Sequence, residues 1–508
     1  MTGKRIARNV AFNWVALAST AVVGFFLSPY VVHHLGNVAY GVWVLVISLS
    51  SYMNLLDVGM RGAVTRFVSK GFTQGNHDEA NQAISGALWI RYWISAVILL
   101  GSVALALVFN RTFPVPDNLH RVAQIAILFT GGTIALNLSC GVFGGVLAAL
   151  HRFDLLSIVN ILTSILRAAG YVLLLRAGYG ILALALWDLL NAVVTNSLQV
   201  AMAFHVYPQM HVFFGHPSRE TIRKLWGYSF YSFLINVAIQ LVYYTDNLVV
   251  GAFTTAAAVT LYAIGGFLIN YARQIVSSMT TTFGPLASTY EASGQSEKLR
   301  RLLIQGTRAA LVVSLPIELA LFFRGHTFIG LWMGHEYAGP SGTVLQILLI
   351  SMIVGSANTT SGGIVYGIEK HKLIAFWAIL EGALNLGLSI FLVRRIGIYG
   401  VAWGTTIPSL LIELLLWPPY ISRLVGIPMW QYLWQTWIRT ALAAVPFALA
   451  CYFSDRYWTA NNLATFFLQV LILLPIFALS LAAMFWRELG RTSSPQLRRL
   501  IPWHVGEH

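Results

Sequence analysis

The sequence predicts an all-α polytopic membrane protein with about fourteen transmembrane helices, arranged as two pseudo-symmetric six-helix lobes plus two extra C-terminal helices. Composition predicts the class, because hydrophobic residues make up 57% of the 508 residues and charged residues 10%, against roughly 25% charged in a soluble domain. No soluble core could bury that much apolar surface, so the chain must be dissolved in lipid. The apolar stretches and an internal repeat predict the arrangement.

About fourteen apolar stretches have the length, about 20 residues, that a helix needs to cross a bilayer. Six precede a basic loop: 11–34, 40–60, 83–109, 121–150, 155–176 and 181–205. Six follow it: 227–250, 259–283, 303–324, 343–367, 373–394 and 400–422. The last two are 436–454 and 464–486. The loops and tails between them average about 15 residues, so we expect no extramembrane domain.

The distribution of Lys and Arg predicts the orientation. With the N-terminus in the cytoplasm, the cytoplasmic segments carry most of the basic residues, and the opposite side carries only Arg111, Arg121, Arg176, Arg324, Arg394, Arg395 and Arg456. We therefore expect both termini in the cytoplasm. The net charge of +14 is assigned to cytoplasmic loops and anionic lipid rather than to nucleic acid. The first span is too long for the apolar core of a signal peptide and is expected to be retained.

An internal repeat at an offset of about 220 residues predicts two lobes related by an axis along the membrane normal. Gly144-Gly145 leads into a basic turn at His151-Arg152, as Gly362-Gly363 leads into the turn at Lys370. Two such bundles form a cleft suited to alternating access. The predicted parts are an N-lobe over 1–210, an inter-lobe loop over 211–226, a C-lobe over 227–424, and two appended spans with a cytoplasmic tail over 425–508.

Ionisable residues inside the spans are the candidate functional residues, because such a side chain at the bilayer centre costs at least ~2.5–3.5 kcal/mol and must face a cavity or a partner. They are Asp57, Arg91, Arg167, Asp188, Asp246, Arg273, Arg308, Glu318, Glu381, Glu413 and Arg439. The repeat places Arg167 near Asn385 and Asp246 near Gly24. The scaffold is therefore duplicated while most of its charges are not, which favours a specialised cavity.

Five arginines are predicted to bind substrate. Arg167 and Arg273 lie deep in the fifth and eighth spans, where a guanidinium offers a planar fork that matches phosphate oxygens. Arg91, Arg61 and Arg66 lie nearer the cytoplasmic entrance. Two of these three have structural alternatives: Arg61 is spaced to pair with Asp57 one turn away, and Arg91 is close enough to the headgroups to snorkel.

Four acids, Asp246, Asp57, Asp188 and Glu381, are candidates for ion coupling or gating. Asp246 either binds a coupling cation or forms a salt bridge with one of the arginines. Glu413 is equally open, and Glu318 follows Pro316, where a kinked helix exposes backbone carbonyls. The small, polar stretch 355–363 is better explained by close helix packing.

Neither a metal centre nor a cofactor is expected. None of the 13 histidines falls in a metal-ligand spacing. Cys140 and Cys451 lie far apart inside apolar runs, which excludes a disulfide framework and a zinc site as organising elements.

The opening segment resembles the polysaccharide-transporter branch of the multidrug/oligosaccharidyl-lipid/polysaccharide (MOP) exporter superfamily. The residues that carry the resemblance are 35–43 (LGNVAYGVW), 55–60 (LLDVGM), 66–70 (RFVSK) and, in the seventh span, 245–251 (TDNLVVG). The resemblance covers the whole chain and implies two six-helix lobes around a basic cavity in the bacterial inner membrane. It also implies a Wzx-type flippase that moves a lipid-linked oligosaccharide, usually on undecaprenyl pyrophosphate, to the periplasmic leaflet.

The expected function is therefore lipid-linked oligosaccharide export by alternating access, without enzymatic activity. The expected partners are the glycolipid, membrane lipids, Na⁺ or H⁺ as a coupling ion, and polysaccharide polymerase or export proteins. A cation-coupled multidrug exporter of the same superfamily is the first alternative. Such exporters resemble this chain in lobe architecture, but they usually have twelve spans and acidic cavities. A membrane glycan polymerase or ligase is the second, and it would need a larger outer loop than the longest one here, 325–342.

Overall fold

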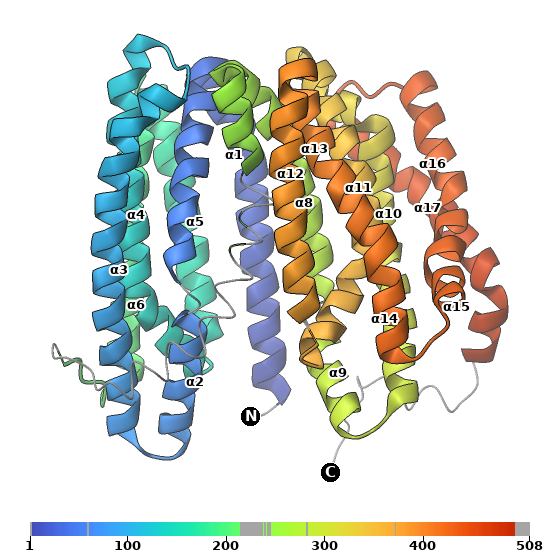
Figure 1. Ribbon diagram of the computed structural model, residues 1–508, viewed down its shortest axis with the longest axis horizontal. Coiled ribbons are helices and arrows are strands. Elements are labelled where there is room, and N and C mark those ends of the chain that lie inside the picture. The colour runs from blue at the N-terminus through green and yellow to red at the C-terminus, as the bar shows by residue number, and fades with distance from the viewer. Residues whose placement is uncertain are drawn as a thin grey trace. The chain divides into compact units, whose positions relative to one another are not determined.

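The computed structural model describes residues 3–57, 60–213, 237, 240, 245–280, 283–370 and 372–492. The chain forms two compact units, Met1–Thr260 and Leu261–His508, and each is described here by itself. Regular structure in the described residues is helical throughout, and 11 of these helices are long and apolar enough to cross a membrane (Figure 1). The predicted class, an all-α polytopic membrane protein, is confirmed.

The helices of the first unit follow the predicted spans. α1 (Gly3–Ser51) contains the first predicted span and the first part of the second, on either side of Gly36, where φ is 74° and ψ is 164°. A short 3-10 segment (Tyr52–Asp57) follows, and then α2 (Met60–Thr73), α3 (His77–Thr112), α4 (Asp117–Ala149), α5 (Phe153–Arg176) and α6 (Ile181–Val206). In this unit α4 packs against α3 and α6, and α1 packs against α5. The seventh predicted span, 227–250, lies mostly outside the described residues.

The second unit repeats this order and adds two spans. α8 (Ala256–Thr280) begins just before the division, and α9 (Phe283–Ala292), α10 (Ser296–Trp332), α11 (His335–Gly367), α12 (Lys372–Ile396), α13 (Ile398–Leu411) and α14 (Trp417–Val425) follow. α15 (Met429–Leu433), α16 (Arg439–Tyr457) and α17 (Leu463–Thr492) form the thirteenth and fourteenth spans. The outer segment 325–342 is almost entirely helical rather than a loop, because α10 and α11 extend into it.

The predicted repeat is visible in the backbone of each unit. α3 begins at His77 and α10 at Ser296, 219 residues later. Left-handed residues precede both helices, at Gly75 (φ 68°) and Gly294 (φ 66°). The two basic turns match as well, since His151 (φ 56°) and Glu369 (φ 58°) are the non-glycine residues with positive φ in the described chain. Local chain geometry is therefore duplicated at the predicted offset, while the lobe boundaries at 210 and 227 stay a prediction.

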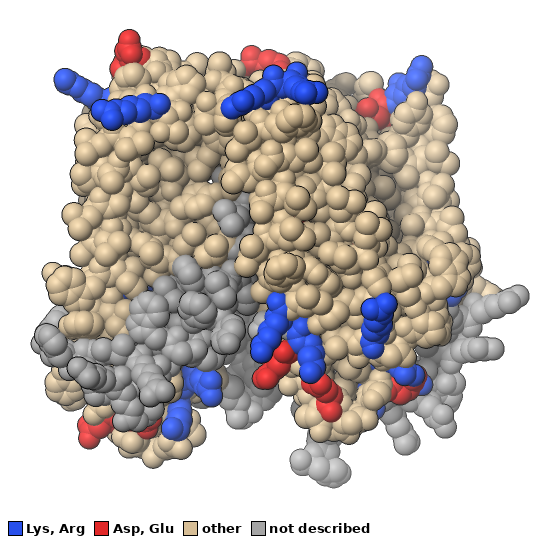
Figure 2. Space-filling view, in the orientation of Figure 1, with Lys and Arg blue, Asp and Glu red and all other residues tan. Residues whose placement is uncertain are grey.

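Charged side chains gather toward the ends of the helices. On the face drawn in Figure 2, the blue and red side chains lie toward its upper and lower margins, and the described part of the middle is tan, without visible Lys, Arg, Asp or Glu. Lipid accounts for this pattern, because a charged side chain is expensive at the bilayer centre and inexpensive near headgroups.

The start of the inter-lobe segment is held against α3. The Asn81 side chain donates to Gln209 O over 3.0 Å and accepts from His211 N over 3.1 Å. Tyr207 lies beside His77, with 2.7 Å between its hydroxyl and Nδ1. Burial raises the pKa of Tyr207, and the nearby Asp78 charge raises it further. The rest of the predicted loop, from residue 214, lies outside the described residues.

The motif at 35–43 has a packing role that can be tested at Gly41. A Cβ at this position would lie 1.7 Å from the backbone oxygen of Ala256, so Gly41→Ala must push α1 away from the start of α8. We expect a loss of about 1–3 kcal/mol in unfolding free energy, measured by thermal unfolding in detergent. Gly387→Ala is the control, because its Cβ would meet nothing within 4 Å. Equal unfolding temperatures for Gly41→Ala and the wild type would contradict this close approach.

Candidate functional site

Arg167 and Asp188 form a two-pronged ion pair between α5 and α6. Arg167 Nε donates to Asp188 Oδ1 over 2.7 Å, and Nη2 donates to Oδ2 over 2.8 Å. Tyr171, one turn further along α5, donates to the same Oδ2 over 2.9 Å and accepts from Nη2 over 3.1 Å. The pair lies inside both spans, and charge-assisted bidentate bonds of this kind are among the strongest in proteins.

The Arg167 side chain is only partly used by this pair. It is 46% exposed, whereas Asp188 is 17% exposed. Within the described chain, hydrogen bonds reach Nε and Nη2 but not Nη1. The guanidinium therefore has one edge committed to protein and one edge open, which is the arrangement a second anion requires.

The corresponding place in the second unit holds a neutral pair. Asn385 and Thr405 lie 218 and 217 residues after Arg167 and Asp188, and the Asn385 amide donates to Thr405 Oγ1 over 3.1 Å. The same two helices of the repeat are thus joined at the same level without charge. Joining the helices does not explain why the first unit places ions there.

Arg91 is fully buried within the first unit. Its side chain is 2% exposed and donates from Nη1 to Leu138 O over 2.7 Å. Nη2 forms a close ion pair with Asp57, and Gly141 leaves the space that Nη1 fills. Snorkelling, the alternative for Arg91, is therefore wrong, because the side chain turns into the unit rather than toward headgroups. The side chain of Arg61 lies outside the described residues, and so does its possible pairing with Asp57.

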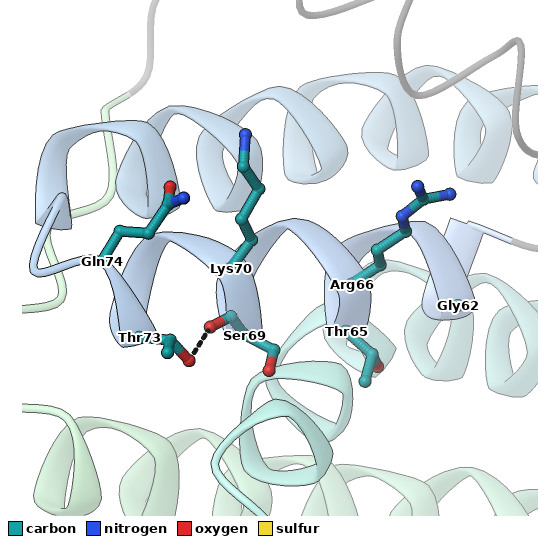
Figure 3. A pocket seen from close by; sticks show the side chains of 7 residues that line it. All are labelled: Gly62, Thr65, Arg66, Ser69, Lys70, Thr73 and Gln74. Atoms are coloured by element: carbon teal, nitrogen blue, oxygen red, sulfur yellow. Dashed lines mark hydrogen bonds between the residues drawn. The ribbon is translucent and has the colours of Figure 1, made fainter.

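Two polar rows on α2 line a hollow at one end of the first unit. Arg66, Lys70 and Gln74 form one row and Thr65, Ser69 and Thr73 the other, around a cavity of about 890 Å³ (Figure 3). Lys70 also contacts Glu79 across 3.5 Å. The row of basic and amide groups places hydrogen-bond donors along one face of α2, where Arg66 was predicted to lie near the entrance.

Asp246 is buried near α1 and the 3-10 segment. It is 6% exposed, and its neighbour Thr245 shares a 2.6 Å hydrogen bond with the Tyr52 hydroxyl. On its other side, Asn247 donates to Ser48 Oγ over 3.1 Å. The chain around Asp246 is therefore fixed by polar contacts within the first unit.

Glu413 and Glu381 form an acidic cluster with Arg273 in the second unit. Glu413 lies in a π-helical segment, Ile412–Leu416, a helix irregularity that is frequent at functional sites. The amide of Asn358 donates to the Glu413 carbonyl over 3.0 Å and to Oε2 over 2.5 Å. Glu381 accepts a hydrogen bond from Ser409, and Arg273 acts electrostatically on both carboxyls. Arg273, predicted as a cavity arginine, thus sits beside two acids.

Glu318 is a second buried acid, with hydroxyl neighbours. It is 0% exposed and accepts a hydrogen bond from Ser356 Oγ over 2.5 Å. Ser356 and Asn358 both come from the polar stretch 355–363. Close packing there is confirmed, since a Cβ on Gly306 would lie 2.6 Å from Thr360. The stretch also supplies side chains to two acids, a role that its small-residue composition conceals.

Three arginines connect the last two spans to the other helices of the second unit. Arg308 and Arg439 both lie against Phe485 of α17, with their Cζ atoms 4.8 and 4.5 Å from its ring centroid. Arg324, expected at the outer end of the ninth span, is 0% exposed within α10. Its Nη2 donates to Gln469 over 2.5 Å, and its Nε lies 3.7 Å from Asp455. Apolar length predicted the end of the span at Arg324, whereas α10 continues to Trp332.

Among the described residues, no three or more His, Cys, Asp or Glu side chains lie close enough together to hold a metal ion. Cys140 and Cys451 are free.

Comparison with known proteins identifies the family. The family described as "Polysaccharide biosynthesis protein" matches residues 6–291, more than half of the chain. The chain belongs to this family. Over 501 residues it is 22% identical to the "Probable low-salt glycan biosynthesis flippase Agl15" of Haloferax volcanii, covering 98% of this chain and 99% of that protein.

Solved structures place this member of the family in the fold of the MOP superfamily. The "Lipid II flippase MurJ, inward closed conformation" superposes with a TM-score of 0.69 at 16% identity, covering 95% of this chain and 100% of that one. A structure titled "Inward-facing conformation of a multidrug resistance MATE family transporter of the MOP superfamily" gives a TM-score of 0.66 at 13% identity, covering 80% and 94%. The family member is thus a multi-pass membrane protein that shares the fold of these two structures.

Proposed function

We propose that the protein flips a polyprenyl-pyrophosphate-linked oligosaccharide from the cytoplasmic to the periplasmic leaflet of a bacterial inner membrane, with both termini in the cytoplasm. The observation that carries the proposal is the half-open guanidinium of Arg167 inside the spans of a polysaccharide biosynthesis family member. A headgroup with two phosphates and several sugars cannot cross hydrocarbon unaided. A protein that moves it needs cations within the membrane, since the charge of the phosphates is the largest barrier.

The arginines have separate roles in this proposal. Arg66 and Lys70 on α2 attract the pyrophosphate from the cytoplasmic leaflet, because paired cations near a membrane surface raise the local concentration of anions. Arg167, with one edge open, binds a phosphate oxygen at mid-span, and Arg273 is kept as the second deep binding candidate. Arg91 and Arg61 are kept as binding candidates. The site opens to one leaflet at a time, as alternating access requires, while the polyprenyl chain stays in lipid.

The acids couple or gate this cycle. Asp57 and Asp188 each hold an arginine, so we assign both to gating, in which an ion pair opens when substrate phosphate replaces the carboxylate. Asp246 and Glu381 are assigned to ion coupling with Na⁺ or H⁺. Export that is indifferent to Asp246→Asn would remove Asp246 from this list.

Gene deletion followed by mass spectrometry of polyprenyl-linked glycans tests the function. We expect one lipid-linked oligosaccharide to accumulate and the matching surface polysaccharide to disappear, with both restored by the wild-type gene. The Arg167→Ala/Arg273→Ala double variant should fail to restore them. Arg176→Ala is the matched control on the exposed end of α5. Unchanged glycolipids together with new sensitivity to cationic dyes would overturn the proposal in favour of multidrug export.

A further inference from the structure

We infer that the second unit binds an exchangeable proton shared by Glu381 and Glu413, and that this proton is the coupling ion. The inference rests on the proposed function for its purpose, but the site itself is argued from the local structure. Both carboxyls belong to one cluster with Arg273 and Asn358, in the part of the bundle formed by α8, α11, α12 and the π segment after α13.

The charges of this cluster do not balance when both of its carboxyls are ionised. Among the described residues, Arg273 is the one cation that acts on either carboxyl, and it acts on both. The other titratable group nearby is the hydroxyl of Tyr432 on α15, which is uncharged near neutral pH. Two carboxylates and one guanidinium leave one negative charge inside a span. Two carboxyls that share a low-dielectric site do not both stay ionised, so one proton relieves the excess.

Asn358 provides a second, independent observation. The residue is 2% exposed, and its amide nitrogen donates to two Glu413 oxygens, which fixes the orientation of the amide. Its Oδ1 is buried and has no hydrogen-bond donor in the described chain. Ionised carboxylates are acceptors only, whereas a protonated carboxyl is also a donor. A protonated acid in the cluster therefore supplies what the orphan oxygen lacks.

The π segment explains why the Glu413 carboxyl lies in this cluster. In an α-helix each carbonyl accepts from the amide four residues on, and a π turn shifts this pattern by one residue. The shift leaves the Glu413 carbonyl directed at Asn358. Gly355, one turn earlier on α11, lies against Glu413, and a Cβ there would be 3.7 Å from Oε1. The helix irregularity and the small residue together place the carboxyl between α11 and α12.

Partial exposure distinguishes this cluster from the other buried acid. Glu381 and Glu413 are both half-buried, whereas Glu318 is 0% exposed and is bonded to a serine hydroxyl. A proton on Glu318 has no path to exchange and serves only to neutralise the acid. The Glu381–Glu413 pair keeps some accessible surface, which a coupling proton requires in order to exchange.

Infrared difference spectroscopy of the purified full-length protein in nanodiscs tests the site without any substrate. Wild type minus Glu413→Gln should show a carboxylic-acid carbonyl band that fades as pH rises. Wild type minus Glu381→Gln should show the same band, because removing either acid removes the shared proton. Gln keeps the shape of Glu and one acceptor oxygen, so both variants should fold. The control is Glu291→Gln, on the exposed end of α9, whose difference spectrum should lack that band.

Two results would overturn the inference. The first is an infrared spectrum in which both carboxyls stay ionised at every pH down to the pH at which the protein unfolds. The second is stabilisation of the wild type against heat by Na⁺ but not K⁺, lost in Glu413→Gln, which would make the ligand a metal cation. Glycolipid accumulation in the deletion strain is measured separately, so failure of the flippase function and failure of the proton site give different results.

Discussion

Replacing Arg167 and Asp188 by the residues of the second unit is expected to abolish most export while leaving the protein folded. The variant Arg167→Asn/Asp188→Thr installs the pair that already joins the equivalent helices through Asn385 and Thr405. Each lost hydrogen bond to a charged group is worth about 1.5–3 kcal/mol, so we expect export to fall about ten- to hundred-fold. Surface polysaccharide and accumulated glycolipid in the complemented deletion strain measure the loss.

Two companion variants separate charge from packing at this pair. Asp188→Asn keeps the Arg167 cation but removes the carboxylate that competes with the substrate phosphate for it. We therefore expect substrate to bind but to leave slowly. Arg167→Lys keeps the charge and loses the fork, and it should retain only part of the activity because a lysine is not bidentate. Size-exclusion profiles in detergent should match the wild type for all three variants. Full export by the Asn/Thr variant would show that the ion pair only joins helices.

Removing Asp455 is expected to destabilise the second unit more than removing its partner Arg324. Asp455→Ala leaves the Arg324 guanidinium at 0% exposure without its acid, and stranding a buried charge costs about 3–5 kcal/mol. Arg324→Leu removes the buried charge altogether and leaves an apolar side chain beside Phe466. The loss of unfolding free energy should therefore be smaller than for Asp455→Ala. Thermal unfolding followed by Trp fluorescence measures both.

The double variant closes this cycle. Arg324→Leu/Asp455→Ala should be more stable than Asp455→Ala alone, because no buried charge remains to be stranded. Arg456→Ala is the matched control, since its exposed side chain lies next to Asp455 in sequence. A double variant less stable than Asp455→Ala would mean that Arg324 contributes chiefly through Gln469 and Phe466 rather than through the ion pair.

These two experiments depend on contacts that no sequence pattern contained. Asp188 was expected to couple or gate, and Arg167 to bind substrate, but nothing in their spacing of 21 residues indicated that they meet. Asp57 was a gating candidate with Arg61, one turn away, as a possible partner, and nothing in the sequence indicated its described partner Arg91, 34 residues away. Long side chains reach across helix interfaces, and the interface is decided by the packing of entire helices.

The acids of the second unit show the same division. The sequence placed Glu381, Glu413 and Glu318 inside spans, because a charge in an apolar run is easy to recognise. It did not indicate that Asn358 binds Glu413 or that Ser356 binds Glu318. Both partners lie in a stretch whose small residues already had a sufficient explanation in helix packing, so composition could not reveal their second role.

The sequence by itself determined the membrane class, the order and approximate bounds of most of the spans, the repeat near 220 residues and the set of intramembrane charges. Each of these follows from local properties: apolar length, periodic recurrence and the cost of an ion in lipid. Only the tertiary structure decided which charges meet, that Arg324 is buried within α10, and that Glu413 lies in a π segment beside Asn358. Those outcomes depend on residues far apart in the chain, whose approach is determined by how helices pack.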